Sequence, residues 1–337
     1  MPQFIENIAV PTKMTTEKSK RWNIFKWGCL AAAFIFLLYR LICFQHYEQL
    51  ISQFKELSFW KTWFLWGVML LLPANWLLES VKWQRLVRNS EKIDITSAFH
   101  SVMAGFLTAF FTPNRVGEVA GRIAFLQPEN RKAGVTLSLV NSATQNIIMA
   151  VCGIPAAVIF FLNSKNSEYL GKSNLLGYFV MVGVILLLLS SIYFSLPKLV
   201  GRIKQKKSSA KWISYISCLT DYSFTDLLKI LLLSFLRYLV FSFQFYLMLR
   251  FFGVEITGWA AAIAIPTTYL FVTFTPSMAF SEAAIRSSYS VLVIGAFSGQ
   301  TVQVILASTF IWIVNFVVPM LVGSFVLMQT HPIATNK

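Results

Sequence analysis

Hydrophobic residues fill long stretches of this chain, and short polar stretches that are rich in lysine and arginine separate them. A helix needs about 20 apolar residues to cross the hydrocarbon core of a bilayer, and several stretches approach or exceed that length. The apolar segments are 27–44, 60–82, 97–112, 133–162, 175–197, 226–251, 257–275, 281–298 and 301–328. The pattern predicts an all-α polytopic membrane protein with about six to eight membrane-spanning helices.

The composition agrees with this class. Hydrophobic residues make up 56% of the 337 positions and charged residues 13%, and the mean hydropathy is +0.62. Soluble domains carry about 25% charged residues, so a soluble fold is excluded. No shift in composition and no long linker marks a second domain, so we expect residues 1–337 to form a single integral membrane domain.

The charge of the chain is strongly positive, with 29 Lys and Arg against 14 Asp and Glu. In a soluble protein this excess would indicate nucleic acid. Here the basic residues gather in short loops such as "KWQRLVRNSEK" and "KLVGRIKQKKSSAKW", as in cytoplasmic loops of membrane proteins. The pattern therefore predicts a multi-pass protein of the cell membrane, with both termini in the cytoplasm and no nucleic-acid partner.

This orientation constrains segment 97–112. The basic loops at 82–92 and 115–132 flank it, and both are expected on the cytoplasmic side. The segment must then enter and leave from the same side, as a re-entrant hairpin whose turn is covered by protein or faces a cavity. The same reasoning makes 257–298 a hairpin that enters from the outside. We therefore expect two facing hairpins in an inverted repeat, with half-repeats at approximately 60–162 and 226–328.

A short motif occurs once in each predicted hairpin, as "FFTPNRVGEVAGR" and as "TFTPSMAFSEAAIR". Each copy contains Thr-Pro, at Thr112-Pro113 and at Thr275-Pro276. Threonine is a good helix N-cap, and proline is tolerated at the first helical position. Both Thr-Pro pairs are therefore predicted to start a helix at membrane depth.

Each copy also carries a glutamate with an arginine four residues later, at Glu118 and Arg122 and at Glu282 and Arg286. Residues at this spacing share one helix face and can pair. Arg115 precedes Glu118 by three residues, so the first copy is predicted to place all three charges on one face. Arginines beside a helix N-terminus suit a phosphate or carboxylate, so the motifs predict an anion-binding site.

A simpler interpretation treats the first copy as an ordinary cytoplasmic loop whose charges pair at the surface. The second copy argues against it, because the positive-inside rule requires no charges in a segment that enters from the outside. Interrupted hydrophobic segments at corresponding positions of two halves are also typical of transporter binding sites.

Further polar residues lie inside predicted spans. Ser138, Asn141, Ser142 and Gln145 form a stripe on one helix face, and Arg237 lies about 11 residues into segment 226–251. We expect Asn141, Gln145 and Arg237 to line a hydrated cavity, because a buried arginine is costly unless it is paired or hydrated. Hydrogen bonding between helices is the alternative role for the stripe.

Two residue pairs receive structural interpretations. Gly117 and Gly121 form a small-xxx-small step that favours close helix packing. Glu79 and Lys82, near the end of the second apolar segment, are interpreted as an interfacial ion pair.

The sequence gives little indication of catalytic chemistry. Asp94, Asp221 and Asp226 form no closely spaced pair, no histidine lies near the arginine-rich motif, and the four cysteines form no CxxC. We therefore expect no enzyme activity, no metal and no cofactor. An integral membrane enzyme that acts on a lipid phosphate, or an accessory subunit without transport, are the alternatives to a transporter.

The stretches "WQRLVRN" and "AGFLTAFFTPNRVGEVAGR" resemble the signature of the lysylphosphatidylglycerol synthase transmembrane-region family, also called flippase-like domain proteins. The resemblance covers roughly residues 20 to 325. The second motif keeps Pro276 and Glu282 but lacks the glycines that the family usually shows there. The first motif matches at Pro113, Arg115, Gly117, Glu118 and Arg122.

The resemblance implies a membrane domain that moves an anionic or zwitterionic lipid, or a lipid-linked head group, between leaflets of a bacterial inner membrane. The expected partner is a membrane lipid. The protein is further expected to form a homo-oligomer or to work with a separate lipid-synthesising enzyme. A soluble synthase domain follows the membrane part in some members. Because this chain ends at Lys337, shortly after its last apolar segment, we expect it to lack that activity.

Overall fold

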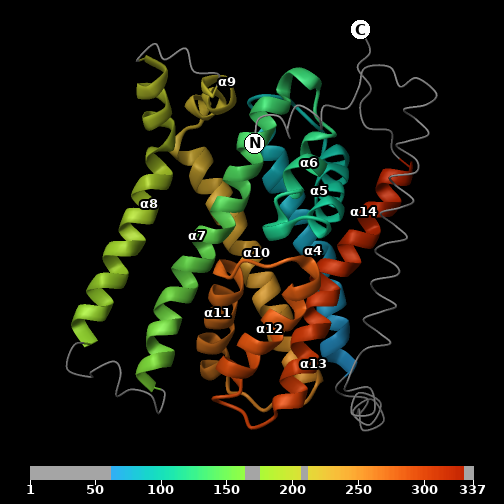
Figure 1. Ribbon diagram of the computed structural model, residues 1–337, viewed down its shortest axis with the longest axis vertical. Coiled ribbons are helices and arrows are strands. Elements are labelled where there is room, and N and C mark those ends of the chain that lie inside the picture. Colours follow the sequence, from blue (N-terminus) through green and yellow to red (C-terminus); the bar gives the residue numbers. More distant parts are fainter. Residues whose placement is uncertain (1–61, 164–174, 206–211, 330–337) are drawn as a thin grey trace.

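The computed structural model describes residues 62–163, 175–205 and 212–329, and every regular element in these ranges is a helix (Figure 1). The apolar segment at 27–44 lies outside the described residues. Within the described ranges, five helical stretches are long and apolar enough to cross a membrane: Thr62–Val87, Pro128–Leu162, Val180–Gln205, Phe224–Phe251 and Thr301–Met328. The prediction of an all-α polytopic membrane protein is confirmed.

The chain runs twice through the same order of elements: a long helix, a short helix, a turn, a returning helix and a second long helix. The first series is α4 (Thr62–Val87), α5 (Ile95–Phe110), the 3₁₀ turn η2 (Pro113–Arg115), α6 (Glu118–Ile123), the 3₁₀ turn η3 (Pro128–Asn130) and α7 (Arg131–Asn163). The second series is α10 (Phe224–Phe251), α11 (Gly258–Phe274), α12 (Ala279–Ile294), α13 (Thr301–Trp312), the π-helical turn η6 (Ile313–Val317) and α14 (Val318–Gln329).

Three elements of the described residues lie between the two series. They are α8 (Leu175–Gln205), the single-turn helix α9 (Ile213–Ile216) and the 3₁₀ helix η5 (Ser217–Asp221). Figure 1 shows α8 running beside α7 along the full height of the molecule, with α9 at the end where α5 and α6 lie. The second series therefore begins at the end of the bundle opposite to the start of the first, which gives the inverted arrangement.

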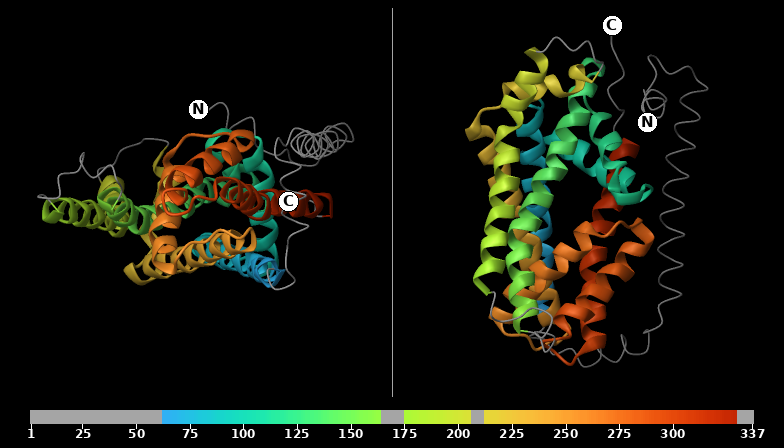
Figure 2. Two further views of the ribbon diagram at one scale, coloured as in Figure 1. Left: turned by 90° about the horizontal axis from the view of Figure 1, so that it is seen from below. Right: turned by 60° about the vertical axis from the view of Figure 1, so that its left-hand side comes forward.

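The hairpins α5–α6 and α11–α12 start from opposite ends of the bundle and turn back near its middle (Figures 1 and 2). Helix α5 has 16 residues and α11 has 17. At 1.5 Å per residue each is about 25 Å long, too short to cross the hydrocarbon core alone. The two predicted re-entrant hairpins are present, and their turns face each other.

Polar caps fix where the shorter helices begin. The Asp94 carboxylate accepts the backbone N–H groups of Thr96 and Ser97 at the start of α5, and Thr257 caps α11 through Ala260. Hydrogen bonds from Ser97 hold the pKa of Asp94 below its usual value. These side chains satisfy N–H groups that a helix start leaves without partners, so each hairpin enters the bundle at a defined residue.

Close packing of glycines holds the first hairpin together. A Cβ atom at Gly117 would collide with the carbonyl oxygen of Thr108, and one at Gly121 with that of Ala104. Helix α6 therefore lies directly against the backbone of α5, as the small-xxx-small step predicts. On another side of α5, Gly323 of α14 approaches the carbonyl of Met103 in the same way.

Candidate functional site

The backbone of the first motif departs from the predicted helix start. Thr112 and Pro113 begin the short turn η2, but Asn114 and Arg115 have φ values of 51° and 58°. This left-handed conformation is unfavourable for non-glycine residues and interrupts the helix. Helix α6 begins only at Glu118. The prediction that Arg115, Glu118 and Arg122 share one helix face is therefore wrong.

The first Thr-Pro pair starts the short 3₁₀ helix η2, whereas the second Thr-Pro pair does not start a helix. Thr275 is the C-cap of α11, Pro276 lies in the exposed turn, and α12 begins at Ala279. The Ser281 hydroxyl accepts the N–H of Met278 and so caps this helix instead. Both proline turns end a helix and reverse the chain, which allows each hairpin to return to its own end of the bundle.

The turns of the two hairpins contact each other. The Asn114 N–H donates to the Ser277 carbonyl over 2.8 Å, and the Ser277 N–H donates to the Asn114 side chain over 2.9 Å. This reciprocal pair satisfies backbone groups of both turns. It also fixes the left-handed conformation at Asn114, which directs the next side chain, Arg115, towards the second hairpin.

Arg115 pairs with the second motif. Its Nη2 and Nε atoms donate to the two carboxylate oxygens of Glu282, over 2.6 and 3.3 Å, and Arg286 donates to the same carboxylate over 3.0 Å. We call these three residues the hairpin cluster. The Arg115 guanidinium also lies 4.4 Å from the ring centroid of Phe316, and Arg286 lies 5.3 Å from that of Tyr269. The predicted pair of Glu282 and Arg286 is present.

A second group of charges surrounds Glu79 of α4. The Glu79 carboxylate accepts a hydrogen bond from Nη1 of Arg237 over 2.8 Å and another from Nδ2 of Asn141 over 2.7 Å. It also lies 3.1 Å from Nζ of Lys82. Arg122 donates to both Glu79 and Glu118, so the predicted pair of Glu118 and Arg122 is also present. We call this group the α4 cluster: Glu79, Lys82, Glu118, Arg122, Asn141 and Arg237.

The interpretation of Glu79 and Lys82 as an interfacial pair is wrong, because both side chains are 1% exposed. Helices α6, α7 and α10 bring Arg122, Asn141 and Arg237 to this part of α4. A buried carboxylate is tolerated when cations and hydrogen-bond donors surround it. The sequence does indicate a buried polar network here. Asn75, Glu79 and Lys82 are spaced by four and three residues, so they lie on one face of α4.

The remaining predicted residues separate into two kinds. Arg237 and Asn141 both contact Glu79, whereas Gln145 donates to the Ser234 carbonyl over 3.4 Å and joins α7 to α10. The polar stripe on α7 thus divides between the α4 cluster and helix packing. Gly117, Pro113 and Pro276 contribute to the shape of the turns.

Together the two clusters contain five cations, Lys82, Arg115, Arg122, Arg237 and Arg286, and three carboxylates, Glu79, Glu118 and Glu282. Their formal net charge is +2 when all are ionised, which is unfavourable among apolar helices.

Several donors in this region lack an acceptor. Within the described part of the chain, Nε and Nη1 of Arg122, Nε of Arg286 and the indole N–H groups of Trp83 and Trp312 are buried without one. Trp83 lies under the Arg122 guanidinium, with 5.2 Å between that group and the ring centroid. Unmatched donors and excess positive charge occur in the same region and favour an anionic ligand.

Exposure differs between the clusters. The Arg115 side chain is 39% exposed, whereas Arg122 is fully buried. Arg115 is therefore the most exposed charged side chain of the two clusters. Among the described residues, no group of three or more His, Cys, Asp or Glu side chains is arranged to hold a metal ion.

Comparison with protein families identifies the family of this chain. The model of the family described as "Lysylphosphatidylglycerol synthase TM region" matches residues 26–326. No curated protein and no solved structure matches the chain. Because the family match spans most of the 337 residues and includes both hairpins, the chain belongs to the lysylphosphatidylglycerol synthase transmembrane-region family, a membrane domain of flippase-like proteins.

Proposed function

We propose that this protein moves an anionic or zwitterionic lipid, or a lipid-linked head group, between the leaflets of the membrane, and that the hairpin cluster binds the head group. One observation carries the proposal. Two hairpins that start from opposite ends of the bundle meet at their turns, and Arg115 of one shares a carboxylate with Arg286 of the other. A site at such a junction is reachable from either side when one hairpin moves relative to the other.

The chemistry of the cluster suits a phosphate. Arg115 already presents two donors to the carboxylate of Glu282, and the same fork matches two phosphate oxygens. Glu282 holds Arg115 and Arg286 side by side, so it organises the site while limiting its charge. The net charge of +2 in the two clusters is offset when a head-group phosphate binds.

The contacts between the hairpins suggest how access alternates. The Arg115–Glu282 pair and the reciprocal bonds between Asn114 and Ser277 join the two turns directly. Separation of the turns would open the cluster toward one end of the bundle. With cytoplasmic termini, α5–α6 borders the cytoplasmic opening and α11–α12 the outer one.

We further propose that the protein works in a bacterial inner membrane, as a homo-oligomer or beside a separate lipid-synthesising enzyme.

Transport in proteoliposomes tests this function. Purified protein is reconstituted with phosphatidylglycerol that carries a fluorophore on one acyl chain, and dithionite quenching reports how fast the lipid exchanges between leaflets. Arg115→Ala should slow exchange by about tenfold or more, because it removes the two-donor fork of the proposed phosphate site and leaves the buried Glu282 carboxylate with Arg286 alone. Arg88→Ala is the matched control, because Arg88 is 62% exposed and lies 3.6 Å from Asp226 at the end of the bundle.

Wild-type exchange rates in Arg115→Ala, at equal amounts of reconstituted protein, would contradict the proposal. The lipid is recovered after the assay and analysed by mass spectrometry. A membrane enzyme would alter its chemical structure, and an accessory subunit would produce neither exchange nor a chemical change.

A further inference from the structure

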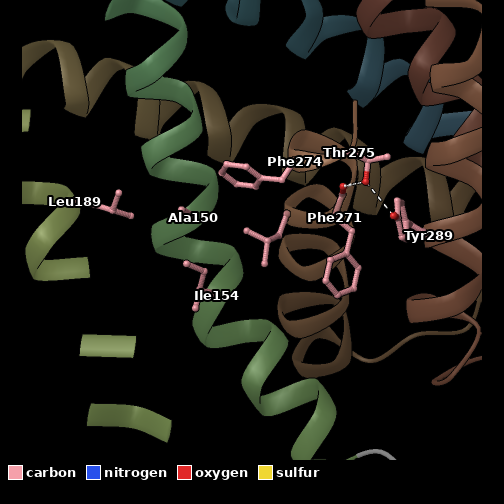
Figure 3. A pocket seen from close by; sticks show the side chains of 8 residues that line it. Ala150, Ile154, Leu189, Phe271, Phe274, Thr275 and Tyr289 are labelled. Atoms are coloured by element: carbon pink, nitrogen blue, oxygen red, sulfur yellow. Dashed lines mark hydrogen bonds between the residues drawn. The ribbon is translucent and has the colours of Figure 1, made fainter. Parts of the chain in front are cut away.

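A half-open cavity of about 520 Å³ lies between α7, α8 and the second hairpin (Figure 3). We call it the apolar groove. Ala150 and Ile154 of α7 form one wall, and Leu189 of α8 faces them. The remaining wall belongs to the second hairpin and includes Leu270, Phe271, Phe274, Thr275 and Tyr289.

The residues that line the groove offer no unpaired hydroxyl donor and no charge. Only Thr275 and Tyr289 among its eight lining residues are polar. Their hydroxyl oxygens lie 2.9 Å apart, and the Thr275 hydroxyl donates to the Phe271 carbonyl over 2.7 Å (Figure 3). The Tyr289 hydroxyl therefore donates to Thr275, and both groups are satisfied within the protein. A charged ligand would find no opposite charge here, whereas an apolar chain fits the lining without leaving a polar group unpaired.

The groove adjoins the hairpin cluster along α12. Glu282, Arg286 and Tyr289 are spaced by four and three residues, so they follow one face of this helix. Arg286 and Tyr289 are separated by only about 4.5 Å along the helix axis, at 1.5 Å per residue. Tyr269 makes a second connection, since its ring contacts Arg286 and the next residue, Leu270, lines the groove.

We propose that the apolar groove binds an acyl chain of the lipid whose head group occupies the hairpin cluster. The assignment of the head group rests on the proposed function, while the groove rests on its own geometry. A polar site and an apolar groove that share one helix face match the two ends of an amphiphile. Helix α8 is long and apolar enough to cross a membrane and exposes apolar side chains such as Leu187, which is 72% exposed, so we expect hydrocarbon beside the groove and an acyl chain to enter it without crossing a polar layer.

Photocrosslinking tests the groove directly. The probe is phosphatidylglycerol with a diazirine at the middle of one acyl chain, and mass spectrometry maps the labelled residues in purified protein. We expect labels on the α7 and α11 residues of the groove. Ile154→Trp should fill the groove and lower this labelling about tenfold, whereas Leu187→Trp, which adds the same bulk to the outer surface of α8, should leave it unchanged. Leu189→Trp replaces Ile154→Trp if that variant does not fold.

Labels confined to the outer surface of α8, or equal groove labelling in Ile154→Trp and the wild type, would overturn the inference. Arg115→Ala completes the design: a fall in groove labelling supports a head group at the hairpin cluster, and unchanged labelling rejects the link between the two sites. The labelling requires no transport. Groove labels without leaflet exchange would therefore reject the proposed function alone, and exchange without groove labels would reject the groove alone.

Discussion

The two hairpins carry the same glutamate–arginine spacing, but different interactions hold them in place. The first depends on glycine, because Gly117 and Gly121 bring α6 against the α5 backbone. The second has no glycine in its motif and depends on hydroxyl groups. Ser290 contacts Ser308, Ser287 contacts Thr309, and Thr275 contacts Tyr289, so α12 is bonded to α13 and to the end of α11. The same glutamate–arginine pair thus forms on α6, which packs through glycines, and on α12, which is held by hydroxyl hydrogen bonds.

The charges also differ in their surroundings. Arg122 of the first motif is fully buried and belongs to the α4 cluster, whereas the hairpin cluster includes the half-buried Arg115. A buried network mainly fixes the arrangement of helices, and a partly exposed one can exchange its partner for a ligand. From this comparison we expect the α4 cluster to contribute mainly to stability and propose that the hairpin cluster is the first contact of the head group. Four predictions test this division.

The largest effect is expected for Gly121→Leu. A side chain at this position overlaps the carbonyl of Ala104, so α6 can no longer lie against α5. We expect most of the protein to be lost from the monodisperse peak in size-exclusion chromatography in detergent. Ala284→Leu is the control in the second hairpin, because Ala284 is exposed and α12 contains no glycine. Similar yields for the two variants would show that glycine packing does not distinguish the hairpins.

Glu79→Gln should be the next most harmful change. It leaves Lys82, Arg122 and Arg237 without their shared carboxylate, and such an uncompensated buried charge costs about 3–5 kcal/mol. We expect a clear fall in thermal stability in detergent, partly restored in the double variant Glu79→Gln/Arg237→Gln. Glu282→Gln should cost less stability, since its partner Arg115 reaches solvent. The reverse order would show that the hairpin cluster is the structural one.

Arg115→Lys should have an intermediate effect on function. Lysine keeps the positive charge but cannot form the two-donor contact with Glu282. We expect leaflet exchange to fall about threefold to tenfold, which corresponds to about 0.7–1.4 kcal/mol, with little change in melting temperature. A lower melting temperature without loss of exchange would assign Arg115 to the structural network.

The smallest effect is expected for Gln145→Leu. Gln145 makes one long hydrogen bond, of 3.4 Å to the Ser234 carbonyl, and such bonds between membrane helices average about 0.6 kcal/mol. Asn141→Leu should be worse in the same thermal-stability assay, because Asn141 donates to Glu79 over 2.7 Å. Equal effects of both variants would mean that the stripe on α7 acts as one unit.

Much of the architecture could be predicted from the sequence, because membrane spans depend on local composition. Long apolar stretches have to form helices where no water can satisfy the backbone, and basic loops indicate which ends lie together. These two constraints are enough to predict both re-entrant hairpins. The spacing of four residues similarly determines the pairs Glu118–Arg122 and Glu282–Arg286, since helix geometry brings such residues together.

Only the tertiary structure decided which charges meet across helices. Arg115 pairs with Glu282, 167 positions away, because a left-handed turn at Asn114 and Arg115 interrupts the helix that periodicity predicts. Glu79 occupies the centre of the buried network because three other helices bring partners to it, although it lies near the end of its own span. A sequence period describes one helix at a time, whereas the partner of a buried charge depends on how separate helices pack.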